Sequence, residues 1–226
     1  MMYHDGHRER LRHRYIKSGI DGFQDHEIIE LILTYAIPRR DVNPIAHKIA
    51  DELGGLTGVL ESDIKTLSSI EGIGERSAVL IKLFNDVGRR YQLDKCGPKM
   101  LLDSVQSMGQ YCVALAHGRT QESLHLVCLD AQKRLISVFL ASEGTPGEVQ
   151  VQIRKLIEIA LKNNADSVVL THNHPGGTAT PSHNDIMTTH HITDAFKAVG
   201  IKLIDHIIVA QQQFMSMNEL GYMKFR

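Results

Sequence analysis

A short segment of the chain, LTHNHPGGTATPSHND (residues 170–185), gathers side chains of the kind that bind metal ions. His172 and His174 stand two residues apart at the end of SVVLT, an apolar run that predicts a strand. Alternate side chains of a strand point to the same face, so both imidazoles can reach one point while Asn173 faces away. The Pro-Gly-Gly sequence then turns the chain, and Asp185 lies in the first turn of the next predicted helix. Two imidazoles and a carboxylate that converge in this way match a catalytic zinc site, in which a fourth position is left for water.

Simpler explanations for the same residues stay open at this point. Ser182 followed three residues later by Asp185 is also the pattern of a capping box, in which the side chains only close the first turn of a helix. The capping and metal-binding roles of Asp185 are compatible with each other. His183 is a further candidate ligand in the same turn. We expect His206 to hydrogen-bond Asp205 or the backbone inside a sheet.

The elements that hold these residues follow from the spacing of the apolar side chains. Residues 6–91 have helical spacing, as in HEIIELILTYAI, a helix that Pro38 ends, and Asn43 is the expected cap of the next helix. The later part of the chain alternates between strand and helix patterns. Its expected elements are a strand pair at 122–130 and 134–142, a helix at 152–166, a strand at 167–174, a helix at 182–200 and a strand at 201–210.

A break in both patterns separates the two parts. The stretch LDKCGPKM contains Gly97 and Pro98, which are typical of linkers, and a chain of 226 residues can form two small domains. We therefore predict an α+β protein with a small all-α domain over residues 1–95. A mixed β-sheet domain flanked by helices is expected over residues 101–226.

Composition narrows the class of protein further. The formal net charge is −1, which lacks the basic excess of many nucleic-acid-binding proteins. No apolar run approaches the length of a membrane span, and the N-terminal sequence MMYHDGHRER lacks the apolar core of a secretion signal, so we expect a cytoplasmic protein without membrane contact. The three cysteines are scattered and lack CxxC spacing, which argues against a disulfide framework or a zinc–thiolate site.

The complete spacing of the histidine segment resembles the JAMM motif of MPN-domain zinc metalloproteases. The longer string HNHPGGTATPSHND, with EGT before it and DHIIV after it, is still more similar to the RadC family, and this resemblance spans nearly the whole chain. It implies an MPN fold with Zn²⁺ as the cofactor. His172, His174 and Asp185 would bind the zinc ion, and Ser182 would lie near the developing oxyanion of the substrate.

The same resemblance implies a general base, a glutamate on a strand upstream of the histidines. Our choice is Glu122, which opens the strand pattern ESLHLVCLD. Glu143, Glu148 and Glu158 are the alternatives. Without such a role, Glu122 is an exposed carboxylate at the end of a strand.

The first part of the chain contains a second candidate site. In SSIEGIGERSAVLIKLF, the spacing of Gly72 and Gly74 resembles a helix-hairpin-helix loop, whose backbone N–H groups can hold a phosphate without reading base sequence. Arg76 can add positive charge. Weak, non-specific DNA binding is expected from such a loop, and the alternative is an ordinary turn between helices.

Two functions are compatible with these patterns. The first is a zinc-dependent hydrolase of the JAMM type, RadC-like and associated with DNA repair, that cleaves peptide or isopeptide bonds in a protein or peptide substrate. The second is a DNA-binding repair or recombination accessory protein, whose MPN domain is a structural or partner-binding module.

Overall fold

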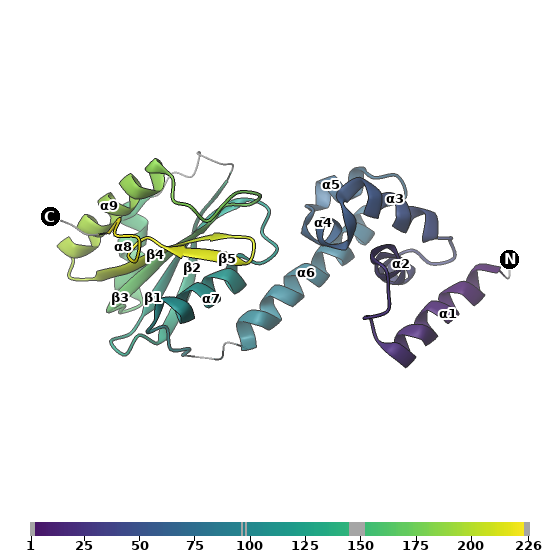
Figure 1. Cartoon of the computed structure of the whole chain (residues 1–226), viewed down its shortest axis with the longest axis horizontal. Helices are drawn as coiled ribbons and strands as arrows, with labels where there is room; N and C mark the ends of the chain where they lie inside the picture. The colour runs from purple at the N-terminus through teal and green to yellow at the C-terminus, as the bar shows by residue number, and fades with distance from the viewer. Residues whose placement is uncertain (1–2, 96, 98, 145–151, 224–226) are drawn as a thin grey trace. The chain divides into compact units, whose positions relative to one another are not determined.

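The computed structural model describes residues 3–95, 97, 99–144 and 152–223. Packing divides the chain into two units, Met1–Gly88 and Arg89–Arg226 (Figure 1). This division falls inside helix α6 (Glu75–Lys95), before the break at Gly97 and Pro98 at which the sequence suggests a boundary. Among the described helices, none combines the length and the apolar character that a bilayer crossing requires.

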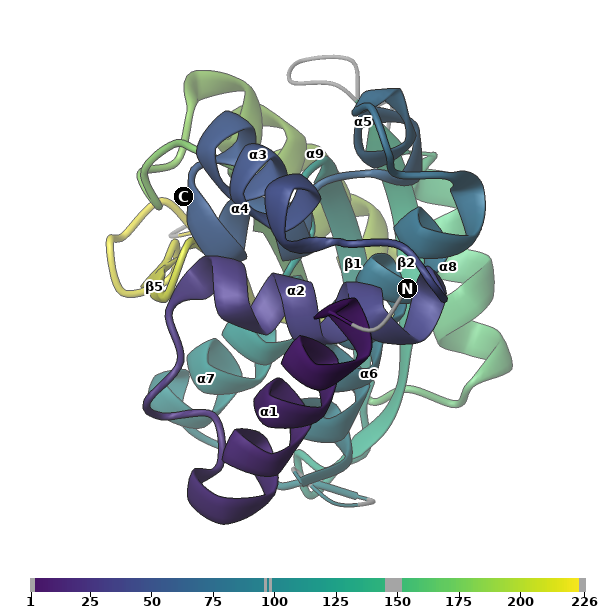
Figure 2. The same cartoon turned by 90° about the vertical axis from the view of Figure 1, so that its right-hand side faces the viewer.

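The N-terminal unit is helical, as its apolar spacing predicts (Figure 2). In α2, Ile29, Ile32 and Leu33 form the buried stripe that packs against the next helices. The expected cap at Asn43 is wrong: Val42 occupies the cap position, and the Asn43 side chain donates instead to Glu30 at 2.8 Å. The helices of this unit before α6 are α1 (Tyr3–Ser18), α2 (Asp25–Ala36), α3 (Asn43–Leu53), α4 (Gly55–Glu61) and α5 (Ile64–Ser69).

The C-terminal unit is built on a five-stranded mixed sheet with the strand order β2-β1-β3-β4-β5. Among the described strands, only β3 and β4 pair parallel to each other, and the other neighbouring strands pair antiparallel. The predicted strand pair and the two later strands are present, and the short β5 was not predicted. The strands are β1 (Glu122–Leu129), β2 (Leu135–Gly144), β3 (Ser167–Asn173), β4 (Lys202–Ala210) and β5 (Gln213–Ser216).

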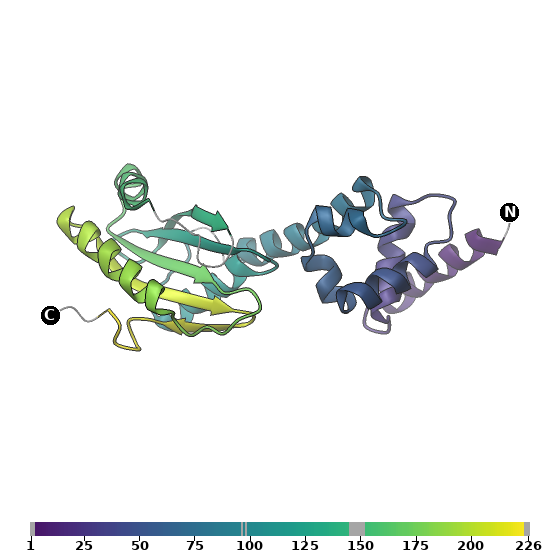
Figure 3. The ribbon, with the colours of Figure 1, turned by 90° about the horizontal axis from the view of Figure 1, so that it is seen from above.

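Helices cover both faces of this sheet (Figure 3). The alternation along β3 shows how: Leu170 packs in one core with α8 (Ile153–Lys162) and α9 (His183–Ala198), whereas Val169 packs in another core with α7 (Val105–Ala116). A sheet covered on both faces explains why nearly every residue of β3 is buried. The predicted fold class, an all-α part followed by a mixed sheet flanked by helices, is confirmed.

Candidate metal centre

The carboxyl end of β3 carries both histidines of the candidate site. His172 lies in the strand and His174 follows it, and their ring centroids are 4.4 Å apart. Both side chains are largely buried, with 11% and 17% of their surface exposed. The backbone N–H of His174 donates to Val209 O on β4 at 2.8 Å, so pairing with the neighbouring strand continues past the end of β3. The strand geometry that predicts convergent imidazoles is therefore present.

The first turn of α9 brings Asp185 to these imidazoles. Ser182 is the cap residue, and its N–H and hydroxyl group both donate to Asp185 Oδ2 at 2.7 Å. The capping box is therefore real. The same carboxylate also faces the histidines, with Oδ1 3.6 Å from His172 Nδ1 and Oδ2 3.5 Å from His174 Nε2. Asp185 therefore forms the capping box and at the same time lies beside both imidazoles.

The hydrogen bonding of His174 leaves an electrostatic conflict that a cation would resolve. Its Nδ1 lies 2.8 Å from the carbonyl oxygen of Thr178, a pure acceptor, so Nδ1 must carry a proton. In a neutral ring Nε2 then presents a lone pair to the Asp185 carboxylate, and two acceptors face each other. Either a proton on Nε2 or a metal ion bound by both groups removes the repulsion. An outer hydrogen bond from one ring nitrogen to a carbonyl group is also the usual support of a metal-binding histidine.

The charge states of these groups differ because their surroundings differ. Burial lowers the pKa of His172 to about 4, against the attraction of Asp185. Hydrogen bonding to Asp185 raises the pKa of His174. Burial alone would raise the pKa of Asp185, but the hydrogen bond from His174, the nearby His172 and the Ser182 donors together hold it well below its usual range. The carboxylate is therefore ionised and His172 neutral near pH 7, as metal ligands must be.

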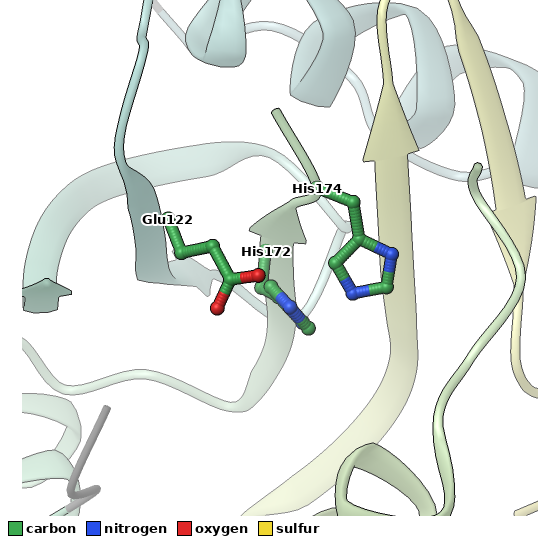
Figure 4. A group of neighbouring side chains, drawn as sticks. All are labelled: Glu122, His172 and His174. Carbon is green, nitrogen blue, oxygen red and sulfur yellow. The ribbon is translucent and has the colours of Figure 1, made fainter. Parts of the chain in front are cut away.

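Glu122, at the first residue of β1, completes the cluster (Figure 4). One donor atom of each of Glu122, His172 and His174 lies within 4.8 Å of the other two. The imidazole pair therefore belongs to two possible ligand sets, one with Asp185 and one with Glu122. Asp185 approaches both rings and is held in place by Ser182, whereas the Glu122 carboxylate lies beside the imidazole pair without such an anchor to Ser182.

All five predicted site residues of this unit line one cavity of about 290 Å³. The cavity walls come from β1, from the end of β3, from the first turns of α9 and from β4. Its lining residues are Glu122, Ser123, Leu124, His172, His174, Ser182, Asn184, Asp185, Thr188 and His206. Donors of nitrogen and carboxylate oxygen in this number suit a zinc ion better than a hard, oxygen-bound cation.

The other glutamates considered for the base lie elsewhere. The Glu143 carboxylate accepts a hydrogen bond from Arg119 at 3.0 Å. On the exposed side of α8, Glu158 accepts one from Arg154 at 2.8 Å. Glu148 lies outside the described residues. The structure thus brings together Glu122 and the histidines, and neither Glu143 nor Glu158 lines the cavity.

His206 is a cavity residue whose place the sequence did not reveal. Its backbone N–H donates to Asp205 Oδ1 at 2.7 Å, but its ring Nδ1 bonds Thr189 Oγ1 on α9 at 2.7 Å. The expectation of a bond to Asp205 therefore holds for the backbone of His206 and not for its ring. The hydroxyl group of Thr189 donates in turn to Asp185 O, so His206 supports the helix turn that carries Asp185. Its ring Nε2 is buried without a partner among the described residues.

Acid is expected to destabilise the metal-free chain because buried neutral histidines must then take up protons. Burial lowers the pKa of His125 and of His206 to about 3 each, and that of His172 to about 4. Each of these neutral rings contributes stability that is fully present above about pH 6.5, the pKa of an unfolded histidine. This contribution is lost as the pH falls, by about 2 kcal/mol per residue between pH 6.5 and pH 5. His174 has the opposite sign: because its pKa is raised, its contribution to stability is fully present below about pH 6.5, the unfolded pKa, and is lost as the pH rises above that value.

Urea unfolding at the two pH values measures this loss. His206→Gln should reduce it by about a third, the share of one of three such residues. The exposed His191 serves as a matched control, and His191→Gln should leave the loss unchanged. A free energy of unfolding that stays constant between pH 6.5 and pH 5 would contradict the neutral, buried state of these rings.

The candidate DNA-binding loop lies between α5 and α6 in the helical unit. Gly72 has a φ of +94°, and a Cβ there would lie 2.9 Å from Ile45 Cδ1, so the turn requires glycine. Gly74 accepts the first backbone hydrogen bonds of α6, from Ser77 and Ala78, which places it at the helix start. Arg76 is exposed in the first turn. The local geometry agrees with a helix-hairpin-helix loop and equally with an ordinary turn.

Comparisons with known proteins cover both parts of the chain. Residues 102–222 match the family model of the RadC-like JAB domain, and residues 5–79 match that of the UPF0758 N-terminal region. The chain is 33% identical to a UPF0758 protein of Fusobacterium nucleatum, over 96% of both chains. It is 32% identical to one of Ruegeria pomeroyi (96% of this chain, 97% of the relative) and 33% identical to one of Rhodobacter capsulatus (93% and 99%). The chain therefore belongs to the RadC family, and its C-terminal part is a JAB domain with a metalloprotease-like fold.

Proposed function

We propose that the C-terminal unit is a zinc-dependent hydrolase that cleaves peptide or isopeptide amide bonds. The observation that carries the proposal is the approach of His174 Nε2 to within 3.5 Å of Asp185 Oδ2, while Nδ1 is engaged by Thr178 O. This arrangement is costly for the empty, neutral site and favourable when a divalent cation is bound by both groups. Zn²⁺ would supply Lewis-acid activation of water and of the scissile carbonyl group.

The roles of the residues follow from their positions in the cavity. His172, His174 and Asp185 hold the metal ion. Glu122 would accept a proton on its carboxylate oxygen from the attacking water molecule, whose oxygen bonds to the scissile carbonyl carbon. It would then pass this proton to the amine nitrogen as the C–N bond breaks. Ser182 would stabilise the developing oxyanion, which requires its hydroxyl group to turn away from Asp185 Oδ2, the atom to which it now donates. That donation also orients the Asp185 carboxylate before substrate binds.

The purified 226-residue chain is expected to contain about one zinc per molecule and to cleave members of a proteome-derived peptide library. Mass spectrometry of new amino termini identifies the cleaved peptides, and elemental analysis gives the zinc content. Treatment with a chelator should abolish cleavage, and added Zn²⁺ should restore it. A zinc-loaded chain that cleaves no peptide or isopeptide bond would overturn the proposed activity.

A second function is proposed for the helical unit, namely weak DNA binding without sequence preference. It is supported by the open position of Gly74, where an added Cβ meets no described atom within 4 Å, next to the first turn of α6. Gly74→Asp would place a negative charge there without a steric clash. It should weaken DNA binding by about tenfold or more at low salt, because phosphate and carboxylate repel each other.

Gly22→Asp is the matched control for this charge change. Gly22 lies in the same unit, is exposed and offers equally open space. Fluorescence anisotropy with a labelled DNA duplex at several salt concentrations measures the affinity. Equal affinity of the Gly74→Asp and Gly22→Asp chains would refute a role of this loop in DNA binding.

A further inference from the structure

Asn173, between the two metal-binding histidines, faces away from the cavity and contacts β1. Its side chain is buried, with 6% of the residue exposed, and so is Ser123 at 1%. Asn173 Oδ1 accepts from the N–H of Ser123 at 2.9 Å and from the Ser123 hydroxyl group at 2.6 Å. Asn173 Nδ2 donates to Gln121 O at 3.0 Å. One carboxamide therefore binds the chain on both sides of Glu122.

These bonds take the place of backbone pairing that ends just before them. The paired register of β1 and β3 runs from Leu129 opposite Ser167 to Leu124 opposite His172. Continued by one residue, it sets Ser123 opposite Asn173. At that position the backbone of Asn173 pairs with β4, at Val209, and its side chain supplies the bonds to β1.

The consequence for Glu122 is geometric. Gln121 O belongs to the peptide group before the Cα of Glu122, and Ser123 N belongs to the peptide group after it. When both peptide groups are held, the φ and ψ angles of Glu122 are set, and with them the direction of its Cα–Cβ bond. Glu122 is the first residue of its strand, a place where chains otherwise fray. Its carboxylate is thus aimed at the imidazoles by a residue on the opposite face of the sheet.

We propose that Asn173 is a positioning residue that fixes the orientation of Glu122 by binding the peptide groups on either side of it. The role in catalysis rests on the proposed hydrolase function, in which Glu122 is the base. A carboxamide suits the position because it offers an acceptor and a donor on one short side chain. Aspartate retains the acceptor and lacks the donor, and alanine lacks both.

Amide hydrogen exchange tests the structural part of the proposal without any substrate. In Asn173→Ala the N–H of Ser123 should exchange about 10-fold to 100-fold faster, because it loses its buried acceptor. In Asn173→Asp it should stay protected. The N–H of Val127, in the middle of β1, serves as an internal reference and should be unchanged in both variants. Unchanged protection of Ser123 in Asn173→Ala would overturn the proposal.

Kinetics on the library peptide that the wild-type chain cleaves fastest test the functional part. Asn173→Ala should lower kcat about 10-fold to 100-fold with little change in KM, since a misdirected base affects the reacting geometry and not substrate binding. Zinc content should stay at the wild-type level. Asn163→Ala is the matched control: the Asn163 side chain, at the cap just after α8, also accepts from a serine, Ser137, and donates to a carbonyl group, that of Ile159. It should retain the wild-type kcat.

The decisive comparison uses the Glu122→Gln background. If Asn173 acts through Glu122, adding Asn173→Ala to Glu122→Gln should cause almost no further loss of rate. An equal further loss in both backgrounds would show that Asn173 acts elsewhere, and the proposal would be wrong. Failure of the proposed function has a different signature: Glu122→Gln would then be as active as the wild type, while the exchange of the Ser123 amide would still respond to Asn173→Ala.

Discussion

Glu122→Gln is expected to leave about one zinc per chain and to lower the rate of amide hydrolysis by about 10²-fold to 10⁴-fold, the usual contribution of a positioned general base. Glutamine has nearly the shape of glutamate but takes up no proton near neutral pH. Glu122 lies within reach of both imidazoles, and its backbone is held by Asn173, so the substitution should change chemistry without moving the strand.

The measurement pairs zinc content with kcat on the fastest-cleaved peptide. Glu143→Gln is the control, since Glu143 lies on the neighbouring strand β2 in register with Ser123, and its carboxylate is bound by Arg119. It should retain the wild-type rate. Two other outcomes are informative: loss of zinc in Glu122→Gln would make Glu122 a metal ligand, and full activity would assign the proton transfer to another group.

Local spacing predicted the positions of the proposed metal-binding groups because each contact follows from short-range geometry. His172 lies in β3, and His174, two residues later, continues its pairing with β4, so the extended chain directs both side chains to one face. Ser182 and Asp185 are three residues apart at a helix start, which is the spacing of a capping box. The loop between them is short enough for the helix to return over the strand end. These parts of the site required little knowledge of the fold.

The supporting contacts could not be predicted because they join residues far apart in the sequence. Asn173 and Ser123 are separated by 50 positions, and Thr189 and His206 by 17. Nothing in the local pattern marks Asn173 as more than an outward-facing strand residue. Only the pairing of β1 with β3 brings Ser123 beside it. The registers of strands decide such contacts, and periodicity does not give them.

The sequence patterns did not predict the strand β5 or the helix α7 and wrongly predicted a helix cap at Asn43, each for a physical reason. The strand β5 is four residues long and pairs only with β4, so its sequence QFMS carries too little alternation to be recognised. Helix α7 had a usable signal, because Ser104 caps it with a box formed with Ser107. That signal lies close behind Gly97, where a linker was expected. At Asn43 a residue typical of caps instead donates to the buried Glu30, a case in which tertiary contacts outweigh local preference.

Asp185→Ala is expected to abolish stable zinc binding. Losing a residue that only hydrogen-bonds a metal ligand lowers metal affinity roughly 10-fold to 100-fold, and losing a ligand itself should lower it by well over that. The carboxylate is one of the three proposed protein ligands, faces both imidazoles at 3.5–3.6 Å, and is kept ionised by its neighbours. The substitution also removes half of the capping box and should cost about 1 kcal/mol of stability.

Asp185→Asn keeps an oxygen for the Ser182 donors and loses the charge, so it separates folding from zinc binding. Asp194→Ala, at an exposed position on the same helix, controls for effects on the helix. Competition with a zinc-sensitive dye gives the affinities. Because the repulsion between His174 Nε2 and the carboxylate is the reason for inferring a cation here, wild-type zinc affinity in Asp185→Asn would remove the physical basis of the metal centre itself.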